Sequence, residues 1–189
     1  MIAPDLRLAL PNLISLARLC AVPVTIYLII AGELSWAFWL FAAAGVSDAI
    51  DGYLAKHFRA RSVIGGYLDP LADKALLVSV YITLGMQGHL AAWLVILVVF
   101  RDALIVAGIA LSHALGHPLQ MRPLMVSKVN TALQVTLAGM VLLLHGFKID
   151  GGWTLAVLTA LTAATTLISG AAYVVLGLRG AARIEGASP

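Results

Sequence analysis

Four aspartates are spaced so that two neighbouring helices would bring their carboxylates together. Asp48 and Asp51 stand in one apolar stretch, and Asp69 and Asp73 open the next one. Residues three or four positions apart share a face of a helix, so each pair presents two carboxylates in one direction. Several carboxylate oxygens suit Mg²⁺ or Mn²⁺ better than Zn²⁺. The pattern therefore predicts a divalent cation, Mg²⁺ or Mn²⁺, held between the two faces.

The four aspartates lie in apolar stretches. Placing their negative charges there costs free energy unless a cation offsets the charge. The chain is 61% hydrophobic and 11% charged, whereas soluble domains are roughly 45–50% apolar and about 25% charged. One charge at the centre of a bilayer costs about 2.5–3.5 kcal/mol on insertion scales. The structural alternative is a buried ion-pair network with Lys56, Lys74 and Arg101. Four carboxylates on two faces exceed what such pairing needs, so we favour the metal site.

Six apolar segments, separated by short breaks, must position these acids. They cover residues 8–31, 35–57, 68–87, 90–115, 127–147 and 154–178, and each is long enough to cross a bilayer as a helix. The positive charges between them fall mainly on one side: Arg7, Lys56, Arg59, Arg61, Arg122, Arg179 and Arg183. Lys148 is alone on the other side. The sequence predicts an all-α integral membrane protein with six transmembrane helices and both termini in the cytoplasm.

The length and composition of the chain also limit how many domains it can form and which partners it can bind. Six crossings of about 20 residues take roughly 120 residues, so we expect residues 1–189 to form a single membrane domain. The 12 Lys and Arg against 9 Asp and Glu give a net charge of +3. In a membrane protein this excess indicates orientation and contact with anionic lipids, not nucleic acid. Cys20 is the one cysteine, so an intramolecular disulfide is excluded.

The span from Asp48 to Asp73 resembles the signature of the CDP-alcohol phosphotransferase family, D-x2-D-G-x2-A-R-x8-G-x3-D-x3-D. All fixed positions but one match, and the matching residues are Asp48, Asp51, Gly52, Ala55, Gly65, Asp69 and Asp73. Lys56 stands where the family has Arg, which keeps the charge but loses the planar fork of the guanidinium. Gly65 and Gly66 are expected at the turn into the third helix.

The resemblance implies a membrane enzyme that binds a CDP-linked lipid near the cytoplasmic side, passes its phosphatidyl group to an alcohol and releases CMP. By this resemblance Asp48, Asp51 and Asp69 ligate the metal. Asp73 contributes to the metal site and acts as general base on the acceptor hydroxyl. The residues that would line the CDP pocket are Gly52, Ala55, Lys56 and Gly65.

Two further stretches are similar to one branch of the family. Residues 101–105 and 126–134 resemble segments of the CMP-forming cardiolipin synthases, which use CDP-diacylglycerol and phosphatidylglycerol. The related phosphatidylglycerophosphate synthases use glycerol 3-phosphate and share the type of opening found at residues 11–18. In those we expect Glu after the Arg at position 101, so Asp102 favours the first branch.

Either acceptor carries a phosphate, so cations are expected near the acids. The candidates are Arg18, Arg101, Arg122 and Lys128. On a helix, Thr131 and Gln134 are expected to continue the face of Lys128. For Arg101, the alternative to binding the acceptor phosphate is an ion pair with Asp102 or with the acid cluster.

A cation-coupled membrane transporter is the alternative from a different class, because membrane acids often mark ion paths. Such a path would distribute the acids across the membrane, whereas these gather on two adjacent segments. Two locations fit the sequence, a bacterial inner membrane and an organelle of bacterial descent. Dimerisation is common in the family, so a homodimer stays open.

Overall fold

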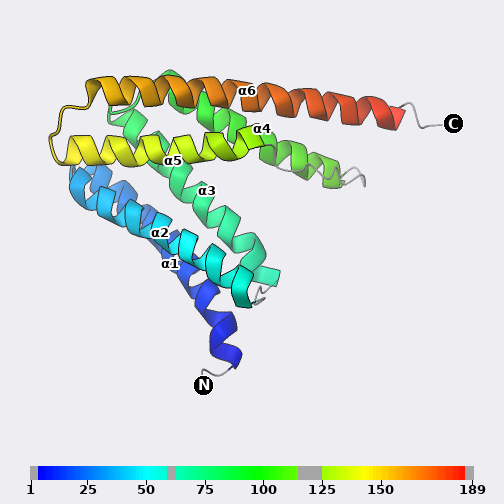
Figure 1. Cartoon of the computed structure of the whole chain (residues 1–189), viewed down its shortest axis with the longest axis horizontal. Coiled ribbons are helices and arrows are strands. Elements are labelled where there is room, and N and C mark those ends of the chain that lie inside the picture. The colour runs from blue at the N-terminus through cyan, green and yellow to red at the C-terminus, as the bar shows by residue number, and fades with distance from the viewer. Residues whose placement is uncertain (1–3, 59–62, 115–124, 186–189) are drawn as a thin grey trace. The chain divides into compact units, whose positions relative to one another are not determined.

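The computed structural model describes residues 4–58, 63–114 and 125–185, with side chains over 16–47, 74–108 and 125–177. Over these ranges the chain forms six helices and no strand (Figure 1). The helices are α1 (Pro4–Ile30), α2 (Leu34–Phe58), α3 (Val63–Met86), α4 (Ala92–Ala114), α5 (Met125–Gly146) and α6 (Gly152–Glu185). The expected all-α class is confirmed.

The helices follow the apolar segments of the sequence and differ from them chiefly at three ends. α1 begins at Pro4, four residues before the expected start at 8. α3 begins at Val63, five residues before the expected start at 68, so Gly65 and Gly66 lie inside the helix and not at a turn. α6 continues to Glu185, past the expected end at 178. Extending an existing helix adds one hydrogen bond for each residue fixed, so a helix can continue beyond the apolar stretch that predicts it.

Two of the described helices are long and apolar enough to cross a membrane. They are α5 over Met125–Gly146 and α6 over Gly152–Gly177. The described apolar stretches of α1, α2 and α3 are shorter, at Leu16–Ile30, Leu34–Ser47 and Lys74–Met86. Six crossings and the cytoplasmic placement of both termini remain predictions.

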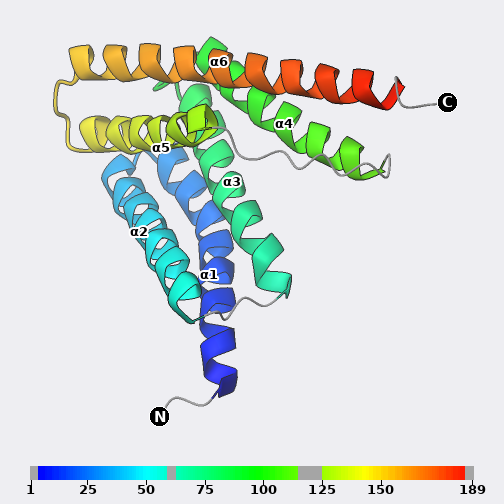
Figure 2. The ribbon, with the colours of Figure 1, turned by 45° about the vertical axis from the view of Figure 1, so that its right-hand side comes forward.

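The chain divides into two compact units, and unit 1 comprises Met1–Leu90 and Ala138–Gly151. Within it, α1 packs against both α2 and α3 (Figure 2). Its described core is apolar, with Ile29, Phe41, Tyr81 and Leu142 all buried. α5 contributes its second half. A Cβ at Gly146 would lie 2.6 Å from the backbone nitrogen of Ser35, so this close approach of α5 to the start of α2 requires glycine.

Three helices in unit 1 end in the same hydrogen-bonded turn. The second residue after each helix end adopts a left-handed conformation, with φ of 77° at Gly32, 76° at Gly88 and 55° at Lys148. The next N–H then donates to a carbonyl five residues earlier: Glu33 to Leu28 at 2.9 Å, His89 to Leu84 at 2.9 Å and Ile149 to Leu144 at 2.8 Å. These are Schellman motifs, which satisfy carbonyls left unpaired at a helix end. Lys148 takes a position that glycine fills in the other two.

Unit 2 comprises Ala91–Leu137 and Gly152–Pro189, and α4 packs against α6 within it. α4 buries Leu94 and Val98. The buried positions of α6 carry hydroxyls instead, and they are Thr162, Thr166, Ser169 and Tyr173. The first half of α5 likewise buries Asn130 and Gln134. Unit 2 therefore has a core in which polar side chains face one another.

Candidate functional site

The signature aspartates lie on two helices of unit 1. Asp48 and Asp51 are in α2, and Asp69 and Asp73 are in α3. Because both stretches are helical, each pair occupies one face of its helix, as the spacing predicts. α1 packs against both of these helices. The acid side chains lie outside those that the structure describes, so their roles remain predictions.

The roles of the residues expected to bind the CDP group remain predictions for the same reason. Gly52, Ala55 and Lys56 lie in α2, and Gly65 lies in α3, with side-chain surroundings outside the described part. Across the side chains that are described, no group of three or more His, Cys, Asp or Glu is placed to hold a metal ion. The metal site therefore rests on the spacing and chemistry of the aspartates.

The four candidate cations for the acceptor phosphate differ in their surroundings. In unit 1, Arg18 of α1 is buried, with 3% of its surface exposed. In unit 2, Arg101 of α4 is equally buried, whereas Lys128 of α5 is exposed. Arg122 lies outside the described residues. Their roles in acceptor binding remain predictions.

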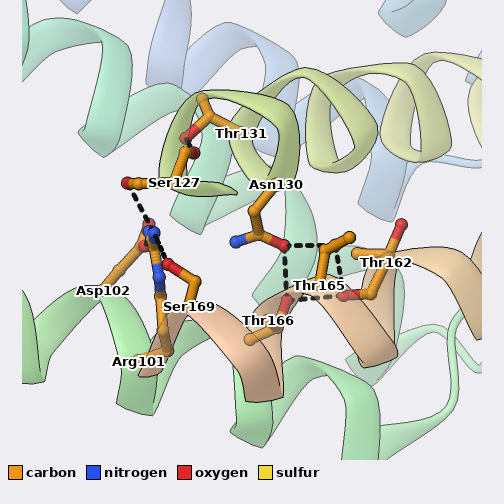
Figure 3. Close-up of polar contacts among 9 residues, drawn as sticks. All are labelled: Arg101, Asp102, Ser127, Asn130, Thr131, Thr162, Thr165, Thr166 and Ser169. Carbon is orange, nitrogen blue, oxygen red and sulfur yellow. Dashed lines mark hydrogen bonds and ion pairs between the residues drawn. The ribbon is translucent and has the colours of Figure 1, made fainter. Parts of the chain in front are cut away.

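Arg101 is the centre of a polar cluster that joins three helices of unit 2 (Figure 3). Its Nη1 pairs with Oδ1 of Asp102 at 2.7 Å. Its Nη2 donates to Oγ of Ser127 in α5 at 2.6 Å and to Oγ of Ser169 in α6 at 2.5 Å. The guanidinium carbon also lies 5.9 Å from the ring centroid of Tyr173, within range of a cation–π interaction.

The structure shows the ion pair between Arg101 and Asp102 that the sequence offered as one alternative. Both are almost fully buried, with 3% and 5% exposure, and they pair with each other. A buried charge is tolerated only when it is paired and hydrogen-bonded, and here both Nη atoms of Arg101 have partners, whereas its buried Nε has none. The residue holds α4, α5 and α6 in register.

A second polar cluster joins α5 to α6 next to the first (Figure 3). Asn130 is fully buried, and its Oδ1 accepts hydrogen bonds from Oγ1 of Thr165 at 2.9 Å and of Thr166 at 2.8 Å. Each threonine hydroxyl also lies within hydrogen-bonding distance of a carbonyl one turn back in α6. Back-bonding of this kind satisfies hydroxyls in an apolar medium.

The expectation that Gln134 continues the face of Lys128 is wrong. Gln134 is fully buried, while Lys128 is exposed. Six residues at 100° each leave two side chains about 120° apart, so they point to different surroundings. The buried face of α5 is instead the one that carries Asn130, Gln134 and Leu137.

Sequence reasoning did not find Ser169, Tyr173 or the threonine partners of Asn130. A signal was present, because the hydroxyl residues Thr162, Thr166, Ser169 and Tyr173 recur at intervals of three or four in a largely apolar segment. That spacing marks one face of a helix. It does not reveal which residue of another helix meets that face.

The family model for CDP-alcohol phosphatidyltransferases matches residues 8–176 of this chain. The chain belongs to this family. The match includes the acid-bearing stretches of α2 and α3 and both polar clusters of unit 2.

Curated relatives of this family member carry two kinds of name. One is the CDP-diacylglycerol–glycerol-3-phosphate 3-phosphatidyltransferase 1, chloroplastic, of Oryza sativa subsp. japonica, 38% identical over 88% of this chain and 56% of its own length. Another is the cardiolipin synthase (CMP-forming) of Homo sapiens, 31% identical over 87% of this chain and 60% of its own length. A cardiolipin synthase (CMP-forming) / mitochondrial hydrolase fusion protein of Schizosaccharomyces pombe is 32% identical over 87% of this chain and 30% of its own length. This phosphatidyltransferase family member therefore spans less than two thirds of the length of each.

Proposed function

We propose that this chain transfers the phosphatidyl group of CDP-diacylglycerol to phosphatidylglycerol, forming cardiolipin and CMP. The observation that carries the proposal is the family match over residues 8–176, within which all four aspartates of the signature are present on two helices. The same match favours group transfer over a cation-coupled transporter. In the reaction the acceptor hydroxyl forms a bond to the phosphatidyl phosphorus, and the bond from that phosphorus to CMP breaks.

The donor set fits Mg²⁺ or Mn²⁺. Carboxylate oxygens are the ligands that these hard cations prefer, and the helical spacing of the aspartates is compatible with two carboxylates on each of two helix faces. Asp48, Asp51 and Asp69 would hold the ion, and Asp73 would contribute to the same site. When bound, the metal neutralises the charge of the pyrophosphate linkage.

The chain's own residues supply the remaining steps. Asp73 accepts the proton of the acceptor hydroxyl, since an alcohol is a weak nucleophile until a base removes its proton. Gly52, Ala55 and Gly65 leave room for the CDP group, because small residues allow a ligand to approach the helix closely. Lys56 provides a positive charge for a phosphate. No covalent intermediate on the protein is needed.

The alternative acceptor is glycerol 3-phosphate, which would make the chain a phosphatidylglycerophosphate synthase. The names of relatives support both acceptors, because one names glycerol 3-phosphate and two name cardiolipin synthesis. Asp102 supports phosphatidylglycerol, through the resemblance of residues 101–105 to the cardiolipin synthase branch. Arg18, Arg101, Arg122 and Lys128 are the cations proposed to face the acceptor phosphate.

We place the whole chain in a membrane, as a single six-helix domain with its acids near the cytoplasmic surface. The apolar lengths of α5 and α6 support this placement, as does the excess of positive charge on one side of the predicted spans. A bacterial inner membrane is the proposed location. CDP-diacylglycerol, as a lipid, would reach the acids from within the bilayer.

A CMP-release assay on the purified chain tests the proposal. The chain is supplied with CDP-diacylglycerol, Mg²⁺ or Mn²⁺, and either phosphatidylglycerol or glycerol 3-phosphate. We expect CMP and cardiolipin with phosphatidylglycerol alone. Release with glycerol 3-phosphate alone would establish the alternative acceptor, and release with neither would contradict both.

The roles of the aspartates are separable by substitution. Asp73→Asn is expected to abolish transfer while leaving metal-dependent nucleotide binding largely intact, because it removes the base. Asp51→Asn and Asp69→Asn should weaken that binding as well. Glu33→Gln, at an exposed carboxylate before α2, is the matched control and should retain activity. Normal turnover by Asp73→Asn would show that another group is the base.

A further inference from the structure

Two histidines meet in unit 1, at the ends of α3 and α5. The ring centroids of His89 and His145 lie 4.7 Å apart, and the rings are inclined at 61°. His89 follows α3, and His145 lies in the last turn of α5. Neither residue belongs to the signature stretch, and α3 alone extends about 25 Å from Asp69 to its end.

The backbone at both helix ends fixes the positions of these rings. The N–H of His89 donates to the carbonyl of Leu84 at 2.9 Å and closes the Schellman motif of α3. The carbonyl of His145 accepts from the N–H of Lys148 at 3.3 Å, within the corresponding motif of α5. Each imidazole therefore projects from a hydrogen-bonded turn, so little backbone freedom remains to be lost when the two rings are held together.

The hydrogen bond made by His145 determines which ring nitrogen is available. Its Nδ1 lies 3.0 Å from the carbonyl oxygen of Val141. A carbonyl only accepts, so Nδ1 carries the hydrogen and, in the neutral ring, Nε2 carries the free lone pair. Metal-binding histidines commonly donate their second N–H to a backbone carbonyl in this way.

The surroundings of His89 favour its neutral form over its charged form. Burial lowers the pKa of His89 below its ordinary value, and the neighbouring His145 ring lowers it further. Two protonated imidazoles at this separation would repel each other. Neutral imidazoles are the form that binds metal ions.

We propose that His89 and His145 form a two-imidazole site for a divalent transition-metal ion of the Cu²⁺, Zn²⁺ and Ni²⁺ class. Imidazole nitrogens suit these ions, whereas the carboxylate set suits Mg²⁺ and Mn²⁺. Within the described part of the chain no third His, Cys, Asp or Glu joins the pair, so water completes the coordination. The bound ion links the end of α3 to the end of α5.

Copper is the probe that reports this geometry directly. The full chain, purified without a histidine tag and kept in detergent, is titrated with Cu²⁺, and its electron paramagnetic resonance spectrum shows how many nitrogens coordinate the ion. We expect one ion with two imidazole nitrogens. His89→Gln and His145→Gln should each leave one nitrogen and weaken binding by at least the roughly 10-fold that loss of an outer-shell partner costs.

The matched control is the double variant His113→Gln/His117→Gln, which removes the chain's other closely spaced histidines and should leave the two-nitrogen signal intact. Elution volume and thermal melting of each variant without metal check that the fold is retained. The proposal is overturned if His89→Gln and His145→Gln bind Cu²⁺ as the parent chain does. Loss of the signal in the control variant would also overturn it. Because binding is read without substrate, failure here leaves the proposed transfer reaction untouched.

Discussion

At the scale of single residues, the Arg101 cluster shows how unit 2 accommodates a buried charge. One guanidinium meets a carboxylate on its own helix and a serine on each of two others. Five donors in a rigid fork can serve several acceptors at once, whereas an ammonium acts as a compact point charge. The role of Arg101 in stability is therefore one that lysine cannot fill.

A double-mutant cycle on Arg101 and Asp102 tests this pair. Arg101→Gln should destabilise the chain by about 3–5 kcal/mol, because it leaves the carboxylate of Asp102 buried without its cation. Arg101→Gln/Asp102→Asn should cost less than the sum of the single variants. The measurement is equilibrium unfolding in mixed micelles, with Lys128→Gln as an exposed control. Additive effects of the two substitutions would contradict the pairing.

At the scale of helices, the equivalent ends of α3 and α5 differ in one respect. Gly88 occupies the left-handed position after α3, and Lys148 occupies the same position after α5. A side chain with a Cβ is strained there, at a cost of about 1–3 kcal/mol, and glycine is not. The α5 end therefore stores strain that the α3 end lacks.

Reciprocal substitutions test that difference. Lys148→Gly should stabilise the chain by up to about 1 kcal/mol, because the relief of strain is partly offset by the entropy that glycine loses on folding. Gly88→Ala should destabilise it by a similar amount. Thermal unfolding of the two variants against the parent chain measures both. A stabilising Gly88→Ala would show that the turn does not impose the left-handed backbone.

At the scale of the whole molecule, stability should depend on pH through His89. Its pKa is lowered in the folded chain, by burial first and by His145 second, so the unfolded chain binds the proton more readily. Stability then rises with pH wherever the unfolded state holds more protons. We expect it to fall as the pH drops below the ordinary value of 6.5, until the folded histidine also becomes protonated.

Metal-free unfolding midpoints across this pH window provide the measurement. His89→Gln cannot titrate, so its midpoint should change less between about pH 7.5 and 5 than that of the parent chain. The difference between the two curves isolates His89 from the carboxylates, which titrate in both proteins. Parallel curves would show that this histidine contributes nothing to the pH dependence.

The sequence predicted the elements of the molecule better than their contacts. Long apolar segments mark helices because burial of apolar surface and internal hydrogen bonding act along the chain, and α2, α4 and α5 lie within two residues of their expected bounds. The signature placed its aspartates on helical faces for the same local reason. In contrast, Arg101 meets Ser127 and Ser169, which are 26 and 68 residues away. Such pairings depend on helix packing, which no spacing within one segment encodes.

The separation of Arg101 from its serines also sets an order of assembly during synthesis. When α4 leaves the ribosome, only Asp102 among these partners has already been made. Ser127 follows with α5, and Ser169 comes 68 residues after Arg101, near the middle of α6. Until then the guanidinium of a half-made chain lacks both serine partners. Packing of the last helix therefore supplies the final hydrogen bond to a charge that was synthesised two helices earlier.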